Sequence, residues 1–462
     1  MGDKFMLKQL FTPVDMTKGV PWKGIVAFSI PMLIGNIAQQ LYNTVDSIVV
    51  GRYVGDNALA AVGSAGPLLN LLLVLFVGIS VGAGIMVSQY FGARQREELS
   101  ETIGNCITLT AISSLFLMVC APPVIRPMLK FLNTPDSILD WCTSYLTILM
   151  VGIAGMAYYN ILGGILRGLG DSFSALVYLL VATVLNIGLD LLFVAVFQMG
   201  VSGVALATAI AQSVSAVLCF MKLARLTDIF DFRLRYLKMS RKHAWMIVRL
   251  GLPSGLTQAI LSSAMIIVQS LTNSFGEMFI AANVIVMRVD GFAMMPNFSF
   301  GTAMTTYAGQ NVGAGEYDRV VKGAKQGTGI AMGVSATITA LILIFGRYLM
   351  GIFTETSELV DLSMRMMRIL AAGYIAMAVT QSLSGVMRGA GDTMTPMWIS
   401  LITTIVIRVP LAYGISWLTR TPELPHGRCE CVFISLFVSW LMGAVLTFFF
   451  YRRGRWKGKA IK

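Results

Sequence analysis

Charged side chains are scarce in this sequence. Asp, Glu, Lys and Arg make up 13% of its 462 residues and hydrophobic residues 56%, with a mean hydropathy of +0.74. Soluble domains have about 25% charged residues and about 45–50% apolar ones. This composition excludes an ordinary soluble globular protein, and it predicts an all-α polytopic membrane protein.

The sequence also lacks clusters of metal-binding or catalytic side chains. Its two histidines, His243 and His426, fall in predicted loops, and no Ser/His/Asp arrangement can be placed in one site. Six cysteines form no disulfide framework. Cys429 and Cys431 are close together, with only His426 and Glu430 nearby, so a metal or redox site there remains only an alternative. The sequence predicts neither an enzyme nor a bound cofactor.

Phosphate-binding loops are missing as well. Glycines recur as Gly78-x-x-x-Gly82 and Gly164-x-x-x-Gly168, but no lysine follows them in a Walker pattern and no strand precedes them. A nucleotide site and a pump driven by its own ATP hydrolysis are therefore not expected. Small residues at this spacing instead predict close contacts between transmembrane helices.

Long apolar segments dominate what the sequence does contain. Twelve spans are predicted, at 24–50, 57–90, 102–122, 138–166, 173–197, 202–222, 246–272, 279–311, 327–346, 359–387, 394–418 and 432–450. Most Lys and Arg fall in the loops that share a side with the N-terminus. This positive-inside bias predicts a protein of the cell (cytoplasmic) membrane with both termini in the cytoplasm. The net charge of +12 therefore reflects membrane topology, and no nucleic-acid partner is expected.

An internal repeat divides the chain. At nearly one offset, Gly164–Asp171 returns as Gly385–Asp392, Gln89–Ala93 as Gln310–Ala314, Val54–Ala61 as Phe275–Ala282, and Pro31 as Pro253. Each repeat holds six helices, so two six-helix bundles related by a pseudo-two-fold axis along the membrane normal are expected. Transporters of this kind bind substrate between their halves and alternate access.

The repeat determines the predicted domain organisation. The predicted segments are a cytoplasmic N-terminal tail at 1–23, an N-terminal bundle at 24–222, a basic cytoplasmic linker at 223–245, a C-terminal bundle at 246–450 and a basic tail at 451–462. The linker is expected to lie on anionic lipid headgroups and to anchor the topology.

The first span carries a polar stripe. Asn36, Gln40, Asn43 and Asp46 recur at spacings of three and four, so they share one helix face. A carboxylate inside a membrane is costly and usually functional, although Asp46 near the helix end could simply reach the headgroups. Pro31 lies within the same span and predicts a bend there.

The fifth and sixth spans each carry a polar stripe similar to that of the first span. Asn186 and Asp190 are four residues apart on one span, and Thr208 and Gln212 are four apart on the next. With Asp46 they predict a shared wet cavity, or else hydrogen bonds that hold the bundle together. Two poorly solvated carboxylates should not both ionise, so one is expected to hold a proton near neutral pH. Sodium is the alternative occupant, because hard cations prefer oxygen ligands.

Candidate substrate contacts are fewer in the second half. The polar and adaptable residues there are Gln258, Ser262, Met287, Arg288, Asp290 and Met294. The charged pair Arg288 and Asp290 predicts either a buried charge network or a substrate role. The methionines suit a promiscuous pocket, or plain packing. Arg408 has no obvious neighbour in sequence.

Several sequence motifs together resemble those of a known family. Tyr42–Gly55 (YNTVDSIVVGRYVG), Arg167–Asp171 (RGLGD), Asn186–Phe193 (NIGLDLLF) and Gly200–Gln212 (GVSGVALATAIAQ), with the repeat and the twelve spans, resemble the multidrug and toxic compound extrusion (MATE) transporters. The resemblance covers essentially the whole chain. It implies two six-helix bundles around a central cleft and cation-coupled export of organic, often cationic, compounds by a protein for which a monomer suffices.

The resemblance also assigns a coupling site. The chain looks like the DinF-like branch, whose coupling residues match Asp46, Asn186, Asp190 and Thr208 here, with Pro31 as the hinge. The resemblance thus implies an antiporter driven by H+ or Na+. The NorM-like branch adds acidic residues in the seventh and tenth helices. Leu261 and Met377 fall near those positions and cannot bind cations, which argues against a second coupling site.

Three other classes of membrane protein are alternatives to this resemblance. A lipid-linked saccharide flippase of the same superfamily usually has a strongly basic cavity and often fourteen helices. A major-facilitator transporter would show a basic loop signature that Phe91–Glu101 lacks. A channel fits the composition, but the six-helix repeat favours alternating access.

Overall fold

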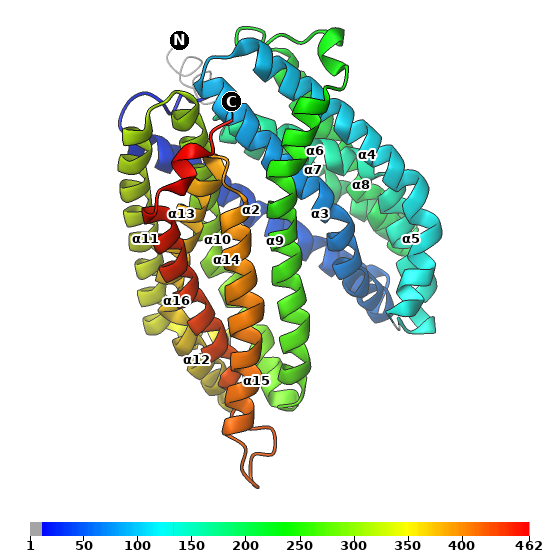
Figure 1. Cartoon of the computed structure of the whole chain (residues 1–462). Coiled ribbons are helices and arrows are strands. Elements are labelled where there is room, and N and C mark those ends of the chain that lie inside the picture. Colours follow the sequence, from blue (N-terminus) through cyan, green and yellow to red (C-terminus); the bar gives the residue numbers. More distant parts are fainter. Residues whose placement is uncertain (1–11, 133, 462) are drawn as a thin grey trace, which may run out of the picture. The chain divides into compact units, whose positions relative to one another are not determined.

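The computed structural model describes residues 12–132 and 134–461. Within these residues the structure is helical, and the one β-type contact is an isolated bridge between Thr421 and Leu424 (Figure 1). Ten helices are long and apolar enough to cross a membrane, or up to twelve if each of two bent helix pairs counts as one span. The predicted fold class, an all-α polytopic membrane protein, is confirmed. Residues 1–11 of the predicted N-terminal tail and Lys462 of the C-terminal tail lie outside the described residues.

Contacts divide the chain into two compact units. Unit 1 holds residues 12–15 and Ile30–Gly255, and unit 2 holds Met16–Ser29 and residues 256–461. Helices α2 (Pro21–Tyr53) and α9 (Arg241–Asn273) each run from one unit into the other. The predicted bundles, 24–222 and 246–450, instead place each of these helices in one bundle.

The remaining helices each belong to one unit. Unit 1 contains α3 (Asp56–Gly92), α4 (Arg96–Phe131), α5 (Asp136–Val151), α6 (Ile153–Gly168), α7 (Ser172–Asp190), the π-helical segment η1 (Leu191–Val196), α8 (Gly200–Ala224) and the short 3-10 helix η2 (Leu234–Leu237). Unit 2 contains α10 (Glu277–Gly313), α11 (Tyr317–Gly351), α12 (Ser357–Ala371), α13 (Gly373–Gly389), α14 (Met394–Leu401), the π-helical segment η3 (Ile402–Arg408), α15 (Val409–Leu418), α16 (Cys431–Arg452) and the 3-10 helix η4 (Arg455–Gly458).

Two segments that were predicted as single continuous helices are each interrupted by a bend. The spans at 138–166 and 359–387 are helix pairs, α5 with α6 and α12 with α13, bent by 54° and 43°. Gly152 lies at the first bend, where an added Cβ would lie 2.6 Å from the Cβ of Ala209 on α8. Gly373 begins the helix after the second bend, where a Cβ would lie 2.6 Å from the Trp440 ring. Small residues at these points let the neighbouring helix approach, which apolar periodicity does not reveal.

The repeated RGxGD motif is a helix stop followed by a helix start. Gly170 and Gly391 have φ angles of +89° and +96°, which glycine adopts at little cost. Asp171 and Asp392 follow, and each carboxylate accepts a hydrogen bond from the backbone N–H three residues on, at 2.9 Å and 3.2 Å. Such N-terminal caps stabilise a helix by about 1 kcal/mol. The repeat is thus a matched pair of tight turns at α6–α7 and α13–α14.

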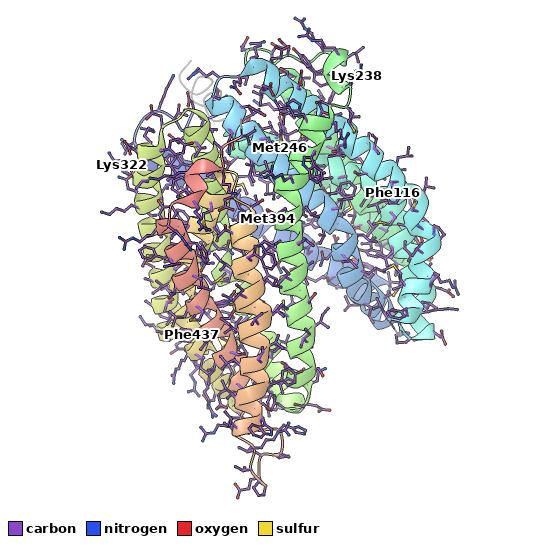
Figure 2. All side chains as sticks on the ribbon, viewed as in Figure 1. Phe116, Lys238, Met246, Lys322, Met394 and Phe437 are labelled. Carbon is purple, nitrogen blue, oxygen red and sulfur yellow. The ribbon has the colours of Figure 1, made fainter. Side chains whose placement is uncertain are left out.

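The predicted close helix contacts are confirmed. A Cβ added at Gly82 on α3 would lie 2.9 Å from the backbone nitrogen of Gly251 on α9. At Gly168 on α6 it would lie 2.7 Å from the carbonyl oxygen of Gly84 on α3. Outward-facing positions are large and apolar, as at Phe116 on α4, whose side chain is 60% exposed (Figure 2). Small residues inside and large apolar ones outside are typical of membrane helices.

The linker between the halves is folded onto α4. Phe230 and Tyr236 are buried, and the Arg96 guanidinium donates to the Asp231 carboxylate at 2.8 Å. This hydrogen bond holds the pKa of Asp231 below its ordinary value. A Cβ at Gly104 on α4 would collide with the Tyr236 carbonyl. The linker is therefore part of unit 1, and contact with lipid headgroups does not describe all of it.

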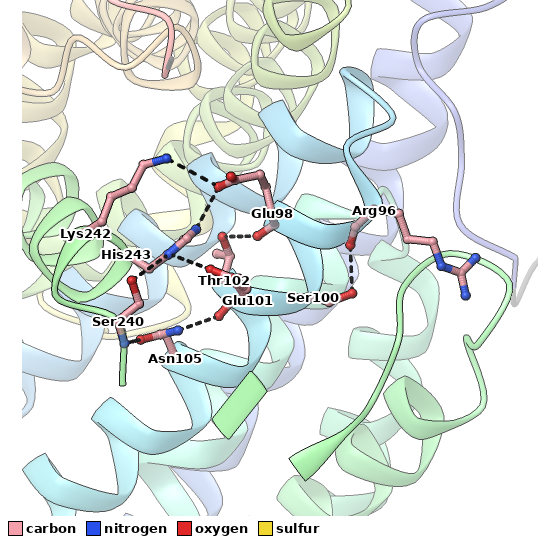
Figure 3. Close-up of polar contacts among 9 residues, drawn as sticks. All are labelled: Arg96, Glu98, Ser100, Glu101, Thr102, Asn105, Ser240, Lys242 and His243. Atoms are coloured by element: carbon pink, nitrogen blue, oxygen red, sulfur yellow. Dashed lines mark hydrogen bonds and ion pairs between the residues drawn. The ribbon is translucent and has the colours of Figure 1, made fainter. Parts of the chain in front are cut away.

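The start of α9 is fixed by a polar cluster (Figure 3). His243, 2% exposed, lies 3.0 Å from Glu98 and 3.3 Å from Glu101, both on α4. The backbone N–H of Ser240 donates to Asn105 Oδ1 at 2.7 Å. These contacts hold the first turns of α9 in unit 1.

The segment before α2 is held in unit 2 in a similar way. The backbone N–H of Met16 donates to Gln310 Oε1 at 2.8 Å, and Asn311 donates to the Met16 carbonyl at 3.2 Å. The Arg319 guanidinium donates to the Gly19 carbonyl at 3.1 Å. Polar anchors therefore hold the beginning of α2 in one unit and the beginning of α9 in the other.

Candidate functional site

Three helices of unit 1 bring the predicted coupling residues together. Asp46 lies on α2, Asn186 and Asp190 on α7, and Thr208 on α8. Asn186 and Asp190 are fully buried, and Asp46 and Thr208 are 8% and 7% exposed. Their spacing placed each pair on one helix face, and the structure adds that these faces converge. We call these four residues together with Tyr42 the carboxylate cluster.

The amide of Asn186 joins the two carboxylates. With its nitrogen turned toward them, it donates to Asp46 Oδ1 at 2.8 Å and to Asp190 Oδ2 at 3.1 Å. This bridge brings the two carboxyl groups close to one another. Two ionised carboxylates would repel in such a contact, so the arrangement suits a pair that shares a proton.

Tyr42 completes the cluster, although the sequence prediction omits it. Its hydroxyl donates to Thr208 Oγ1 at 3.1 Å, and its side chain is 4% exposed. Tyr42 lies one helical turn before Asp46, so the same four-residue spacing that selects the other members could have found it. A tyrosine in an apolar span is easily counted as packing, because most of its surface is hydrophobic.

The cluster has spare capacity for a ligand. In the cluster, Asp190 Oδ1 is buried and has no hydrogen-bond partner among the described residues. Outside it, Gln212 Oε1, one turn after Thr208 on α8, is likewise buried without a described partner. Buried polar atoms normally have partners, so such exceptions are informative. Within the same described part of the chain, no group of three or more His, Cys, Asp or Glu is arranged to hold a metal ion. Any sodium ion here would therefore depend on amide and hydroxyl oxygens as well as the carboxylates.

Next to the cluster the helix changes its hydrogen-bonding pattern. Asp190 ends α7, and the π-helical segment η1 follows directly. Single π-helical turns within α-helices are rare and frequently occur at functional sites. The position of Asp190 at this transition supports a functional interpretation of the carboxylate.

The other predicted first-half residues lie on the same helices. On α2, Asn36 and Gln40 are half-buried and Asn43 is exposed, whereas Gln212 on α8 is buried. Pro31 lies inside α2, next to the point where the helix passes from unit 2 into unit 1. This location suits the hinge role that the resemblance implies, which stays a prediction.

The predicted residues of unit 2 are more scattered. Gln258 and Ser262 are exposed on α9. Met294 is part of the apolar core of unit 2 and Met287 packs against it, so both are placed as packing residues. Their role in a substrate cleft stays a prediction.

The predicted charge network has different members. The side chain of Arg288 is exposed, so a buried network that includes it is wrong. The charge that acts electrostatically on Asp290, two residues away, is that of Arg408. Arg408 lies on η3, far away in sequence, which is why spacing could not find it.

Comparisons with known proteins decide the family. The family model MatE matches the chain twice, over residues 31–192 and 253–414. The chain belongs to the MATE family. The double match also confirms the internal repeat, and membership makes this MATE protein a multi-pass membrane transporter.

Individual relatives agree with this result. The chain is 29% identical over 406 residues to the probable multidrug resistance protein YoeA of Bacillus subtilis, covering 86% of this chain and 88% of YoeA. It is 28% identical over 448 residues to YpnP, a probable multidrug resistance protein of the same organism, covering 96% and 97% of the two chains. A crystal structure of MATE in complex with MaL6 is similar with a TM-score of 0.89 and 25% identity, covering 96% of this chain and 98% of that one.

Proposed function

We propose that this MATE protein is a cation-coupled antiporter that exports small organic cations across the cytoplasmic membrane, driven by H+ or Na+. Both termini would lie in the cytoplasm, and one chain would suffice. The relatives YoeA and YpnP are named as probable multidrug resistance proteins, which supports small organic cargo. The observation that carries the proposal is the pair Asp46 and Asp190, buried and bridged by Asn186.

The chemistry of this pair suggests how exchange is coupled. A dry pair of carboxylates is stable only when a positive charge compensates part of its negative charge. A proton shared between the carboxyls, a sodium ion, or the cationic group of a drug each provides that compensation. The occupants therefore compete, and entry of the coupling cation from outside favours release of the drug.

The bilayer supplies enough energy for such a cycle. One elementary charge that moves across 100 mV releases about 2.3 kcal/mol, which corresponds to a roughly 50-fold shift in an equilibrium. In this proposal Pro31 lets α2 change shape when the occupant of the carboxylate cluster changes. Asp46 lies on the same helix, so occupancy and helix shape are linked directly.

Reconstituted protein tests the proposal. A fluorescent cationic dye is loaded into proteoliposomes, and a proton gradient or a sodium gradient is imposed separately. We expect one gradient to drive dye transport by the wild type and to fail with Asp46→Asn. The matched control is Asp136→Asn, which removes an exposed carboxylate at the start of α5.

Two outcomes would contradict the proposal. Undiminished gradient-driven transport by Asp46→Asn would exclude the carboxylate cluster as the coupling site. Wild-type protein that moves no dye under either gradient would favour the alternative function, transport of a lipid-linked saccharide, and anionic cargo would be tested next.

A further inference from the structure

An open apolar groove on α8 has no role in the proposed transport cycle. Its volume is about 390 Å³, and the residues that line it are Ala209, Ile210, Ser213, Val214, Val217 and Leu218. The one hydroxyl among them, that of Ser213, donates to the Ala209 carbonyl at 2.7 Å and is thereby satisfied within α8. The groove therefore suits a hydrocarbon chain, which gains from close packing and needs no hydrogen bonds.

This groove lies on the lipid-facing side of α8. Val217, one of its lining residues, is 57% exposed. Because α8 is long and apolar enough to cross a membrane, the solvent at this exposed surface is lipid. Thr208 of the carboxylate cluster lies two residues before Ile210, about 200° away around the helix. The groove and the proposed coupling site therefore occupy opposite faces of α8.

The length of the groove matches one leaflet of a bilayer. From Ala209 to Leu218 the helix rises about 14 Å, and half of a hydrocarbon core is about 15 Å thick. Leu218 is six residues before the end of α8 at Ala224. The groove thus ends close to the level at which the headgroups begin, as a site for an acyl chain of one leaflet requires.

The bend between α5 and α6 borders the groove on one side. A Cβ added at Gly152 would lie 2.6 Å from the Cβ of Ala209, and one added at Gly155 would lie 2.9 Å from the backbone nitrogen of Ser213. These close approaches fix the start of α6 against α8 beside the lining residues. The side of the groove is therefore formed by backbone packing and exists before a ligand binds.

A stripe of side chains leads from the groove to a positive charge. Val214, Leu218, Met221 and Arg225 follow one another at spacings of four, three and four residues, so they share one face of the helix. Arg225 is the residue that caps the end of α8, and its backbone is still helical, with φ −87° and ψ −9°. Its side chain is exposed. The apolar stripe therefore ends at an accessible guanidinium.

The linker that follows α8 adds a second accessible cation. The ring of Phe232 packs edge-on against that of Phe220 on α8, with the ring centroids 5.4 Å apart. Arg233 comes next in the chain and is exposed. Lys222 is nearer to the groove in sequence, but it pairs with the buried Asp171 at 3.6 Å and is only 15% exposed. The available cations are thus two arginines, whose planar guanidinium groups match the geometry of a phosphate.

We infer that this groove binds an anionic phospholipid, with an acyl chain along α8 and the phosphate headgroup at Arg225 and Arg233. The groove alone would accept the chain of any lipid, whereas the two guanidinium groups select a headgroup with net negative charge. The inference concerns lipid binding and goes beyond the proposed transport function, so it holds or fails whatever dye transport shows.

Lipid binding to purified full-length protein in a neutral detergent tests the inference. Native mass spectrometry measures the fraction of protein that retains one lipid as phosphatidylglycerol, or phosphatidylcholine with the same chains, is added. We expect the wild type to bind phosphatidylglycerol more tightly. Arg225→Gln should weaken this binding about fivefold and Arg225→Gln/Arg233→Gln about 25-fold, with phosphatidylcholine unaffected. The control Arg52→Gln removes an exposed arginine at the end of α2 and should change neither affinity.

Two further comparisons test the groove itself. Val214→Phe fills it and should weaken the binding of phosphatidylglycerol, whereas Val119→Phe enlarges a valine on α4 that is 66% exposed and should not. Glycerol phosphate, which has the headgroup charge without acyl chains, should not displace the lipid.

Equal affinity of the wild type for the two lipids would overturn the inference, because the groove would then be unselective. So would unchanged phosphatidylglycerol binding by the double arginine variant or by a folded Val214→Phe, or displacement of the lipid by glycerol phosphate. Both arginines are exposed, so their replacement tests the headgroup site even if Val214→Phe does not fold.

Discussion

The two units repeat one fold but place different charges inside it. In unit 1, Asp46 and Asp190 are bridged by the neutral amide of Asn186. In unit 2, the buried charge of Arg408 acts electrostatically on Asp290. The turns and glycine contacts are alike, whereas the buried polar groups are not. A repeated sequence can therefore preserve packing while the buried polar groups of its two halves diverge.

The largest expected effect tests the site of unit 1. Asp190→Asn should abolish acceleration of dye export by the ion gradient, a loss of about 5- to 150-fold if the coupling energy is about 1–3 kcal/mol. The control is Asp140→Asn, which removes a carboxylate that is 75% exposed. The measurement is dye export from proteoliposomes with and without the gradient. Retained coupling in Asp190→Asn would remove the functional difference between the units.

The next effect concerns the charge pair of unit 2. Arg408→Met should lower thermal stability in detergent by about 3 kcal/mol, because it leaves Asp290 in an apolar region without its counter-ion. Adding Asp290→Asn should restore most of this loss, because the remaining groups are neutral. Thermal unfolding of the single and double variants measures the coupling. Purely additive losses would show that the two side chains do not act as a pair.

A third experiment examines where the units are alike. Gly164 in α6 and Gly385 in α13 occupy equivalent positions of the repeat, and each faces the backbone of a neighbouring helix. Gly164→Ala and Gly385→Ala should each destabilise the protein by about 1–3 kcal/mol, because the added methyl group overpacks a close contact. Thermal unfolding checks both variants, with Gly333→Ala as a control that meets no atom within 4 Å. A large effect in only one unit would contradict the structural likeness.

The smallest expected effect refines the unit 1 site. Tyr42→Phe removes the hydrogen bond to Thr208, which is worth about 1 kcal/mol. The affinity for the coupling ion, measured from the dependence of dye export on ion concentration, should weaken about fivefold. Thr208→Val should have a similar effect, and the double variant should add little to either. A double variant that sums both losses would place the two side chains in separate roles.

Local spacing in the sequence was enough to predict most of the unit 1 site. Asn186 and Asp190 lie one turn apart, and a charge in an apolar span is unusual enough to single out Asp46. The sequence could not show that Arg408 acts electrostatically on Asp290, because the two residues lie on distant segments. Exposure of Arg288 could not be predicted either, since its neighbour Asp290 suggested burial.

The fold was also predictable in part: the positions of the helices were, and their packing partners were not. Hydropathy located the spans, and the repeat located their two groups. The bends at Gly152 and Gly373 depend on which helix packs against each glycine, and a single sequence does not provide that information. The passage of α2 and α9 between units was also hidden, because apolar periodicity identifies a helix without identifying its partners.

The crossing of α2 and α9 from one unit into the other has a consequence for how such a protein could arise by gene duplication. Each repeat gives the start of its first helix to the other unit, held there through Met16 in one case and His243 in the other. A half-length ancestor could complete its fold only by exchanging this segment with a second copy, as in a domain-swapped dimer. Fusion of two such copies would make the exchange permanent, and cutting the linker would not release two independent halves.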